Sequence, residues 1–222
     1  MRTKRKTRHA GFTFMELCLG ILITAMVMGA VASFTLATAQ AWKSAEQETN
    51  LAAKGNASVA WIQETIRSAK LLGPVRAGAL DSPAAGSGAA VMLWTADTNS
   101  DGLIQGSEVQ LIEHDVANNR LVLYSGLPTE TTTWSYSSVF TNPSVIDTFK
   151  QGRTPRVFAN DVSGACFSAT GTTGSNANPS LAFSLKLEHA AGGYTNGQSN
   201  GERVLVQYGS GTVRAPKQQP GN

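Results

Sequence analysis

The feature that most constrains this chain is an apolar run near its N-terminus. From Leu17 to Leu36 nearly every residue is apolar, and only glycine, serine and threonine interrupt the run. The stretch from Phe12 to Leu36 is about 25 residues long, which corresponds to roughly 37 Å of α-helix. A helix of that length crosses the hydrocarbon core of a bilayer, so the run predicts a transmembrane helix.

The charges before this run predict its orientation. Five basic residues and no acidic residue precede Gly11: they are Arg2, Lys4, Arg5, Lys6 and Arg8. Basic residues beside a transmembrane helix stay in the cytoplasm, so the C-terminal part is expected outside it. Without those five, the chain has 13 basic against 15 acidic side chains. No basic surface of the kind that binds nucleic acid is left, so we expect no nucleic-acid partner.

A single acidic residue, Glu16, lies near the start of the apolar stretch. A carboxylate inside a bilayer costs a few kcal/mol near the centre and less near the interface. A simple anchor has no use for such a residue. A helix that docks laterally on another helix does, because a cationic group of the neighbour can neutralise it.

The segment from Gly11 to Glu16 reads Gly-Phe-Thr-Phe-Met-Glu, behind a short basic leader and ahead of the apolar run. It resembles the class III signal of type IV pilins and type II secretion pseudopilins. The resemblance implies that a prepilin peptidase cuts between Gly11 and Phe12 and methylates the new N-terminal Phe12. It also implies that Glu16 pairs with the N-terminal amine of a neighbouring subunit during assembly. The similarity covers about the first 40 residues.

Two other interpretations of the N-terminus remain open. One is an ordinary secretory signal, because Ala37-Thr38-Ala39 fits a small-residue cleavage site. That cleavage would release a soluble domain beginning at Gln40. The other is a simple uncleaved anchor. Neither interpretation accounts for Glu16.

The rest of the chain predicts an α+β fold, in which a long N-terminal helix packs on an antiparallel β-sheet domain. Beyond Trp42, which is typical of a membrane interface, an apolar stripe continues at helical spacing until Gly73-Pro74. The stripe consists of Leu51, Val59, Ile62, Ile66 and Ala69. We therefore expect a cleaved leader (1–11), a membrane half (12–36) and an aqueous half (37–72) of the helix, a β domain (77–214) and a flexible tail (215–222).

Alternating or continuous apolar segments predict the strands. They are Val91–Trp94, Val109–Ile112, Leu121–Tyr124, Leu181–Leu187 and Val204–Tyr208, and Phe158–Phe167 is mixed. A turn at Asn118-Asn119 predicts one hairpin, and the last two strands form another. This order, together with the stretch from Arg156 to Gly164, resembles the larger minor subunits, namely J-type pseudopilins and W-type minor pilins.

An acidic segment from Asp97 to Glu108 matches the calcium-loop pattern D-x-[DN]-x-[DN]-G-x5-E at every defined position. The predicted ligands are the side chains of Asp97, Asn99, Asp101 and Glu108 and the backbone carbonyl of Leu103. Gly102 allows the sharp turn, and Ile104 is expected in the core. Because the flanking segments are strands, we expect a structural strand–loop–strand calcium site. A solvated acidic turn is the alternative.

Nothing in the chain predicts catalysis. His9 lies in the leader, His114 beside Asp115 is expected at the surface, and His189 has no recognisable partner. No known catalytic or phosphate-binding motif is present. Cys18 and Cys166 belong to an apolar and an aqueous part, so we expect no disulfide. The predicted function is a non-catalytic minor pilin or pseudopilin without a small-molecule substrate. An adhesin or DNA-uptake subunit and a secreted calcium-binding domain are the alternatives.

Overall fold

The structure, a computed structural model, consists of one long helix and a set of antiparallel sheets. It describes residues 12–81, 88–95, 97, 103–127, 130, 133–134, 142–170, 179–189 and 203–213. Two compact units, Met1–Gln47 and Glu48–Asn222, divide the chain. Helix α1, Phe14–Ser68, begins in the first unit and ends in the second. The predicted α+β class, with an apolar N-terminal helix ahead of a β domain, is confirmed.

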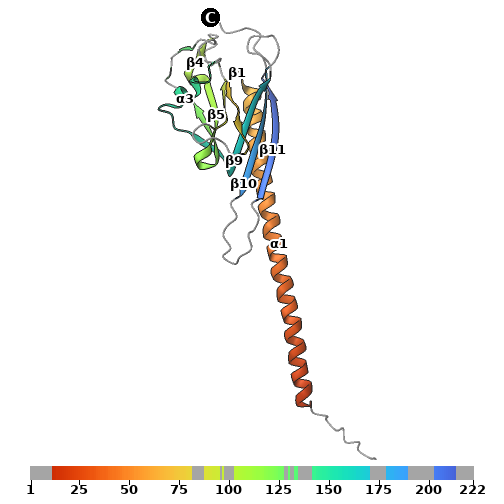
Figure 1. The fold of residues 1–222 in the computed structure, drawn as a ribbon. Coiled ribbons are helices and arrows are strands. Elements are labelled where there is room, and N and C mark those ends of the chain that lie inside the picture. Colours follow the sequence, from red (N-terminus) through yellow and green to blue (C-terminus); the bar gives the residue numbers. More distant parts are fainter. Residues whose placement is uncertain are drawn as a thin grey trace, which may run out of the picture. The chain divides into compact units, whose positions relative to one another are not determined.

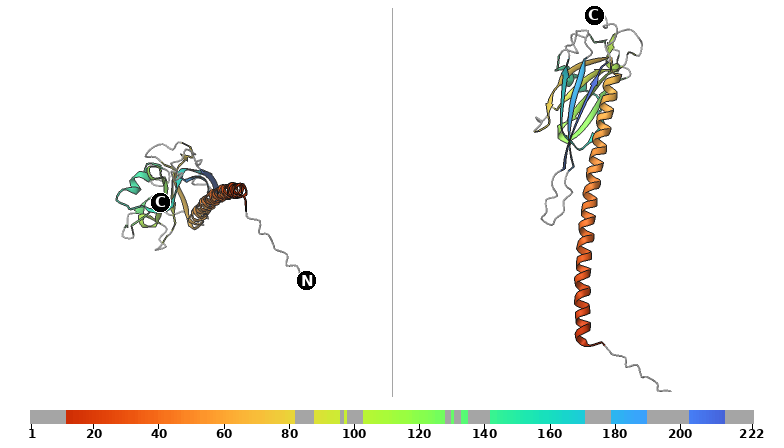
Figure 2. Two further views of the ribbon diagram at one scale, coloured as in Figure 1. Left: turned by 90° about the horizontal axis from the view of Figure 1, so that it is seen from below. Right: turned by 90° about the vertical axis from the view of Figure 1, so that its right-hand side faces the viewer.

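Within the second unit, α1 packs on the sheets through the predicted apolar stripe. Leu51, Ile62 and Ile66 are buried in a core shared with strands of both large sheets. Figures 1 and 2 show β9, β10 and β11 beside this part of the helix. A Cβ atom at Gly55 would lie 3.0 Å from the Gln207 side chain, and one at Gly211 would lie 2.8 Å from Ile66. The two glycines therefore allow the helix and strands to approach closely.

The helix ends earlier than the sequence indicates. The sequence predicts a helix through Leu72 that Gly73-Pro74 terminates, but α1 ends at Ser68 and β1 spans Leu71–Arg76. The backbone N–H of Lys70 already donates to the Trp94 carbonyl at 2.6 Å, so sheet pairing takes over from the helix there. Pro74 is tolerated because β1 is an edge strand and its register shifts between Leu72 and Val75.

The first large sheet has the order β1-β3-β5-β6-β8, with antiparallel pairing throughout. Its further strands are β3 (Ala90–Trp94), β5 (Val109–Asp115), β6 (Arg120–Ser125) and β8 (Arg156–Asn160). The short 3-10 helix η2, Val116–Asn118, and Asn119 connect β5 to β6. Asn119 has a positive φ of 48°, which asparagine tolerates. The predicted hairpin with a turn at Asn118-Asn119 is confirmed.

The second large sheet has the order β11-β10-β9-β2. Its strands are β2 (Gly78–Ala79), β9 (Val162–Thr170), β10 (Ser180–His189) and β11 (Arg203–Thr212). The last two pair in one continuous antiparallel register, as predicted for a hairpin. The predicted alternation along β10 is confirmed, because its apolar residues Leu181, Phe183, Leu185 and Leu187 are buried. The segment predicted as mixed is two strands, β8 and β9, separated by Asp161 at a φ of 64°.

A small sheet, a 3-10 helix and a short α-helix were not predicted. A small sheet pairs β4 (Ile104–Gln105) with β7 (Thr133–Trp134), and the 3-10 helix η1, Gly106–Glu108, follows β4. Helix α3, Val145–Lys150, packs Ile146 and Phe149 into a second apolar cluster on β3 and β5. This cluster covers the face of the first sheet that does not contact α1. Both faces of the sheet are therefore buried at its strands β3 and β5.

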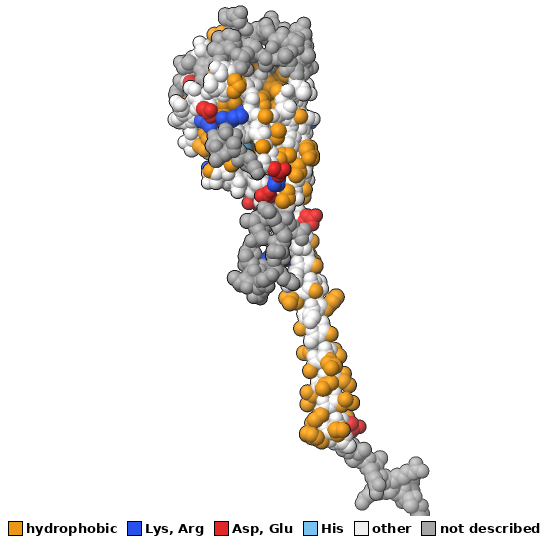
Figure 3. Space-filling model, in the orientation of Figure 1, with side chains coloured by type: hydrophobic (Ala, Val, Ile, Leu, Met, Phe, Trp, Pro, Cys, Tyr) orange, Lys and Arg blue, Asp and Glu red, His pale blue; other side chains and the backbone are white. Residues whose placement is uncertain are grey.

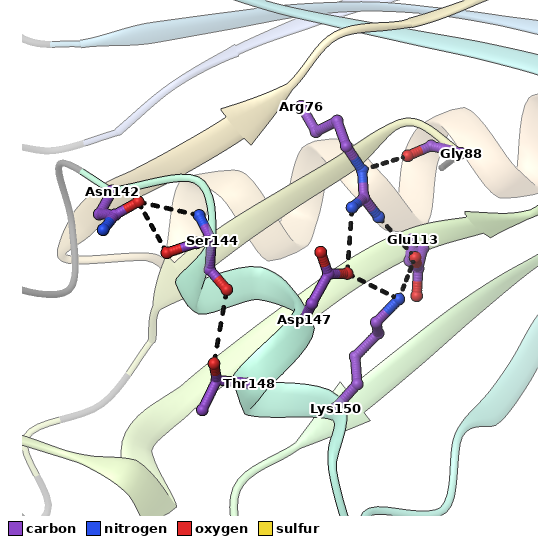
Figure 4. Close-up of polar contacts among 8 residues, drawn as sticks. All are labelled: Arg76, Gly88, Glu113, Asn142, Ser144, Asp147, Thr148 and Lys150. Carbon is purple, nitrogen blue, oxygen red and sulfur yellow. Dashed lines mark hydrogen bonds and ion pairs between the residues drawn. The ribbon is translucent and has the colours of Figure 1, made fainter. Parts of the chain in front are cut away.

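An ion-pair network joins α3 to β1 and β5 (Figure 4). The buried carboxylate of Glu113 lies 2.7 Å from both the Arg76 guanidinium and the Lys150 ammonium. The Asp147 carboxylate lies 3.1 Å from Arg76 and 3.2 Å from Lys150. Just before α3, the side-chain oxygen of Asn142 accepts hydrogen bonds from the backbone N–H and the hydroxyl of Ser144. The network gives a buried carboxylate two cations, as burial of a charge requires.

His114 links the two large sheets. The predicted surface position is wrong, because His114 is 1% exposed and its Nε2 lies 2.8 Å from the Val162 carbonyl of β9. A carbonyl only accepts hydrogen bonds, so Nε2 carries the proton, and Nδ1 has no hydrogen-bond partner among the described residues. Burial lowers the pKa of His114, and its hydrogen bond and the nearby acids Asp115 and Glu113 offset this only in part. The neutral imidazole is therefore the form that fits.

This histidine predicts an acid-sensitive fold. Because its pKa is lower in the folded than in the unfolded chain, its contribution to stability is complete above pH ~6.5 and is lost as the pH falls toward the folded value. We expect the melting temperature of the wild type to fall more steeply from pH 7.5 to 5 than that of a His114→Gln variant. Each pH unit costs at most about 1.4 kcal/mol for one proton. Parallel melting curves of the two proteins would contradict this prediction.

Candidate functional site: the N-terminal helix and the acidic loop

The first unit exposes the apolar surface that the sequence predicts for a membrane-spanning helix. The large apolar side chains from Phe14 to Leu36 are between 53% and 80% exposed. Figure 3 shows hydrophobic side chains along this part of the helix on the face drawn. Among the described residues, α1 is the one helix long and apolar enough to cross a membrane. A single-pass membrane helix is therefore compatible with its length and composition.

The polar residues inside the apolar run keep their hydroxyls within the helix. The hydroxyls of Thr24, Ser33 and Thr35 donate to backbone carbonyls four residues earlier, at 2.7, 2.9 and 2.8 Å. Thr38 does the same at 2.8 Å. A hydroxyl satisfied by its own helix needs no water. These interruptions therefore do not prevent the run from lying in lipid.

The helix begins with a reciprocal capping box between Thr13 and Glu16. The backbone N–H and the hydroxyl of Thr13 donate to Glu16 Oε2 at 2.9 and 3.0 Å. The backbone N–H of Glu16 donates to the Thr13 hydroxyl oxygen at 3.3 Å. This pattern satisfies two backbone donors at the helix start. The box was not predicted, although the spacing Thr-x-x-Glu is a recognised sequence signal for it.

A shallow groove runs along one side of the helix next to Glu16. Its lining residues include Phe12, Glu16, Gly20 and Thr24. Glu16, Gly20 and Thr24 are spaced by four residues and therefore share one face of the helix. A Cβ atom at Gly20 would meet nothing within 4 Å, so the backbone is accessible there. Small residues at this spacing allow another helix to approach closely in a membrane.

The structure describes part of the predicted calcium loop. Of its predicted ligands, Asp97, Leu103 and Glu108 are described, whereas Asn99 and Asp101 lie outside the described residues, as does Gly102. The loop joins β3 to the elements before β5, so the predicted flanking strands are confirmed. Ile104 is 1% exposed, as predicted for the apolar residue of the loop. Within the described ranges, no three His, Cys, Asp or Glu residues form a group that could hold a metal.

Glu108, at the end of the loop, is buried and already hydrogen-bonded. It is 2% exposed, and its Oε2 accepts from the indole N–H of Trp94 at 3.0 Å and from the backbone N–H of Gln105 at 3.3 Å. Its own carbonyl accepts from the backbone N–H of Thr95 at 3.0 Å, which brings the two ends of the loop together. The carboxylate thus has a fixed place beside β3.

Asp97, at the start of the loop, has an incompletely satisfied carboxylate. Its Oδ2 lies 3.6 Å from the Lys70 ammonium. Its Oδ1 is buried and has no hydrogen-bond partner among the described residues. Two acidic side chains therefore stand at the joined ends of the loop, and hard cations such as calcium prefer such oxygen ligands. Calcium binding by the loop stays a prediction.

The capping box gives a testable prediction. A Thr13→Ala substitution removes a capping hydroxyl, which costs about 1 kcal/mol of local helix stability. We expect faster hydrogen exchange at the amides of the first helical turn of the full-length protein in detergent micelles. Thr24→Ala is the matched control, because it also removes a hydroxyl bonded within the helix but lies away from its start. Equal protection of the first turn in both variants would mean that the box contributes nothing.

Comparison with known proteins reveals no relative from which a function could be transferred. The chain matches no protein-family model, no curated protein and no solved structure. What this chain does must therefore be inferred from its own residues. The two features that carry such an inference are the exposed apolar helix with Glu16 and the loop that ends at Glu108.

Proposed function

We propose that this chain is a non-catalytic subunit of a cell-envelope filament, a minor pilin or pseudopilin of a type IV pilus or type II secretion system. The observation that carries the proposal is the difference between the exposed beginning of α1 and its buried later part. Its beginning is exposed and apolar with Glu16 as the acidic residue, while its residues from Leu51 onward are packed on the β-sheets. An exposed apolar helix needs a bilayer or other helices around it.

Processing follows from the resemblance of the first residues to prepilin signals. A prepilin peptidase is proposed to cut between Gly11 and Phe12 and to methylate Phe12. The leader 1–11 lies outside the described residues, and Phe12 is 87% exposed. The basic leader is proposed to stay in the cytoplasm, which directs the β domain to the other side of the inner membrane. The protein is then a single-pass membrane protein before assembly.

Assembly is proposed to use the Glu16 face of the helix. In an apolar surrounding, the Glu16 carboxylate and the N-terminal amine of a neighbouring subunit attract each other strongly. Gly20 and Thr24 on the same face support close packing of the two helices. The partners are thus the prepilin peptidase, the inner membrane and other pilin or pseudopilin subunits. No nucleic acid and no small-molecule substrate is proposed.

Two alternatives make different use of the same chain. An adhesin or DNA-uptake subunit would share the anchor and use the β domain to bind a ligand. A secreted calcium-binding domain would be released near Ala39. A domain released near Ala39 would leave Glu16 without a role, whereas lateral docking of an anchored helix gives it one. Glu16 therefore favours the anchored protein.

We further propose that the loop from Asp97 to Glu108 binds calcium and joins β3 to β5 structurally. The support is that Asp97 and Glu108, the first and last predicted ligands, stand at the two joined ends of the loop. The calcium ion would supply positive charge to a set of carboxylates that otherwise repel one another. Its role is stability of the β domain, without any catalytic step.

The first experiment is an intact mass and N-terminal sequence of the protein purified from its own membranes. We expect a chain that begins with N-methylated Phe12. A Gly11→Val variant should retain the whole leader, because the residue before the cleaved bond is changed, whereas a Gly29→Ala variant should be processed normally. A mature chain beginning at Gln40 would instead support a secreted domain, and an intact N-terminus in the wild type would support a simple anchor.

The second experiment measures the melting temperature of the full-length protein in detergent as calcium is added. For a dissociation constant of about 1 mM, 10 mM calcium adds roughly 1.4 kcal/mol, or about 3–6 °C for a domain of this size. Asp101→Ala should abolish the shift, because it removes a predicted ligand oxygen. Asp81→Ala is the matched control, because Asp81 is an exposed acid outside the loop. An unchanged melting temperature of the wild type in calcium would rule out the proposed role.

A further inference from the structure

Lys70 occupies a fixed position between the end of α1 and the start of β1. Its backbone N–H donates to the Trp94 carbonyl at 2.6 Å, which places the residue directly beside the end of β3. From there its ammonium reaches to 3.6 Å from Asp97 Oδ2. The same ammonium lies 5.4 Å from the centre of the Trp94 ring, within the range of a cation–π contact. Lys70 is thus a cation held at the start of the acidic loop.

The Asp97 carboxylate is largely removed from water. Its side chain is 13% exposed, and Oδ1 is buried with no hydrogen-bond partner in the described part of the chain. Such a carboxylate requires a compensating charge or hydrogen bonds. Lys70 supplies charge, but at 3.6 Å its nitrogen is beyond the range of a good hydrogen bond. Among the described residues, Asp97 is therefore compensated by the charge of Lys70 and not by a hydrogen bond.

Trp94 connects this pair to the other end of the loop. Its indole N–H donates to Glu108 Oε2 at 3.0 Å, while its ring carries the Lys70 ammonium. Both terminal acids of the loop thus contact Trp94 or a group that lies on it. A cation that binds in the loop therefore changes the surroundings of Trp94, both at Glu108 and at the pair of Asp97 and Lys70.

We propose that Lys70 is a tethered counter-ion that competes with calcium for Asp97. The proposal rests on the proposed calcium loop and adds its regulation by a residue outside the loop motif. A calcium ion coordinates a carboxylate oxygen at about 2.4 Å with twice the charge, closer than the ammonium at 3.6 Å. The Lys70 side chain is 41% exposed, so it can turn to solvent at small cost when the metal enters. Loading the loop therefore releases Lys70.

The test is a calcium titration of the full-length protein in detergent micelles, for the wild type, Lys70→Met and Lys70→Arg. Methionine keeps much of the side-chain length and removes the charge, whereas arginine keeps the charge. We expect Lys70→Met to bind calcium about tenfold more tightly than the wild type, because a competing positive charge is gone. Lys70→Arg should remain within about twofold of the wild type. Melting curves in chelator establish that each variant is folded.

Tryptophan fluorescence gives a second measurement that a purely structural ion pair would not affect. Calcium should change the emission of the wild type, because the ammonium leaves the Trp94 ring. The change should be smaller in Lys70→Met, which has no ammonium to release, and it should be lost in Trp94→Phe. The remaining tryptophans, Trp42, Trp61 and Trp134, are unchanged in all these proteins.

The outcomes separate this proposal from the one on which it rests. Equal calcium affinity in the wild type and Lys70→Met would overturn the competition and leave the calcium loop in place. No binding by either protein would contradict both the loop and the competition. Tight binding by Lys70→Met together with weak or no binding by the wild type and Lys70→Arg would support both.

Discussion

The close contact between α1 and the hairpin of β10 and β11 is the constraint on which the rest of the β domain depends. A Cβ atom at Gly211 would lie 2.8 Å from Ile66, and one at Gly55 would lie 3.0 Å from the flexible Gln207 side chain. The contact buries Ile62 and Ile66 completely and gives the inner face of the second sheet its core. The first sheet then shares that core on one face and takes α3 on the other. Any side chain in place of Gly211 would require Ile66 or the strand to shift.

The sequence was sufficient to predict most regular elements, because their signals are local. The helical spacing of Leu51, Ile62 and Ile66 and the alternation from Leu181 to Leu187 both reflect burial on one face. The end of α1 was predicted wrongly because Gly73-Pro74 is a strong local stop, whereas pairing of β1 with β3 is a long-range interaction. Helix α3 is six residues long and too short to show a helical period. The Thr13–Glu16 box was local and could have been predicted.

The partners of the acidic residues were beyond prediction for the same reason. Glu113 is neutralised by Arg76 and Lys150, each 37 residues away along the chain, and Asp97 by Lys70. No spacing rule connects residues that the sheet topology alone brings together. The calcium pattern was visible because its predicted ligands lie within one short segment of the sequence, but the lysine beside it was not. Burial and charge pairing in three dimensions therefore add what a linear motif lacks.

The capping box changes the energetics of the proposed assembly. A carboxylate without hydrogen-bond partners in an apolar groove would gain the whole interaction free energy with an approaching amine. Glu16, however, already accepts two hydrogen bonds from Thr13. A neighbouring amine must share the carboxylate with these donors or replace them, so its net gain is the difference between the two arrangements. The same bonds lower the cost of keeping an unassembled subunit in the membrane. A neighbouring amine therefore replaces the Thr13 hydrogen bonds only when packing of the whole apolar helix holds it beside Glu16. Docking then depends on the register of the two helices along α1 and not on charge alone.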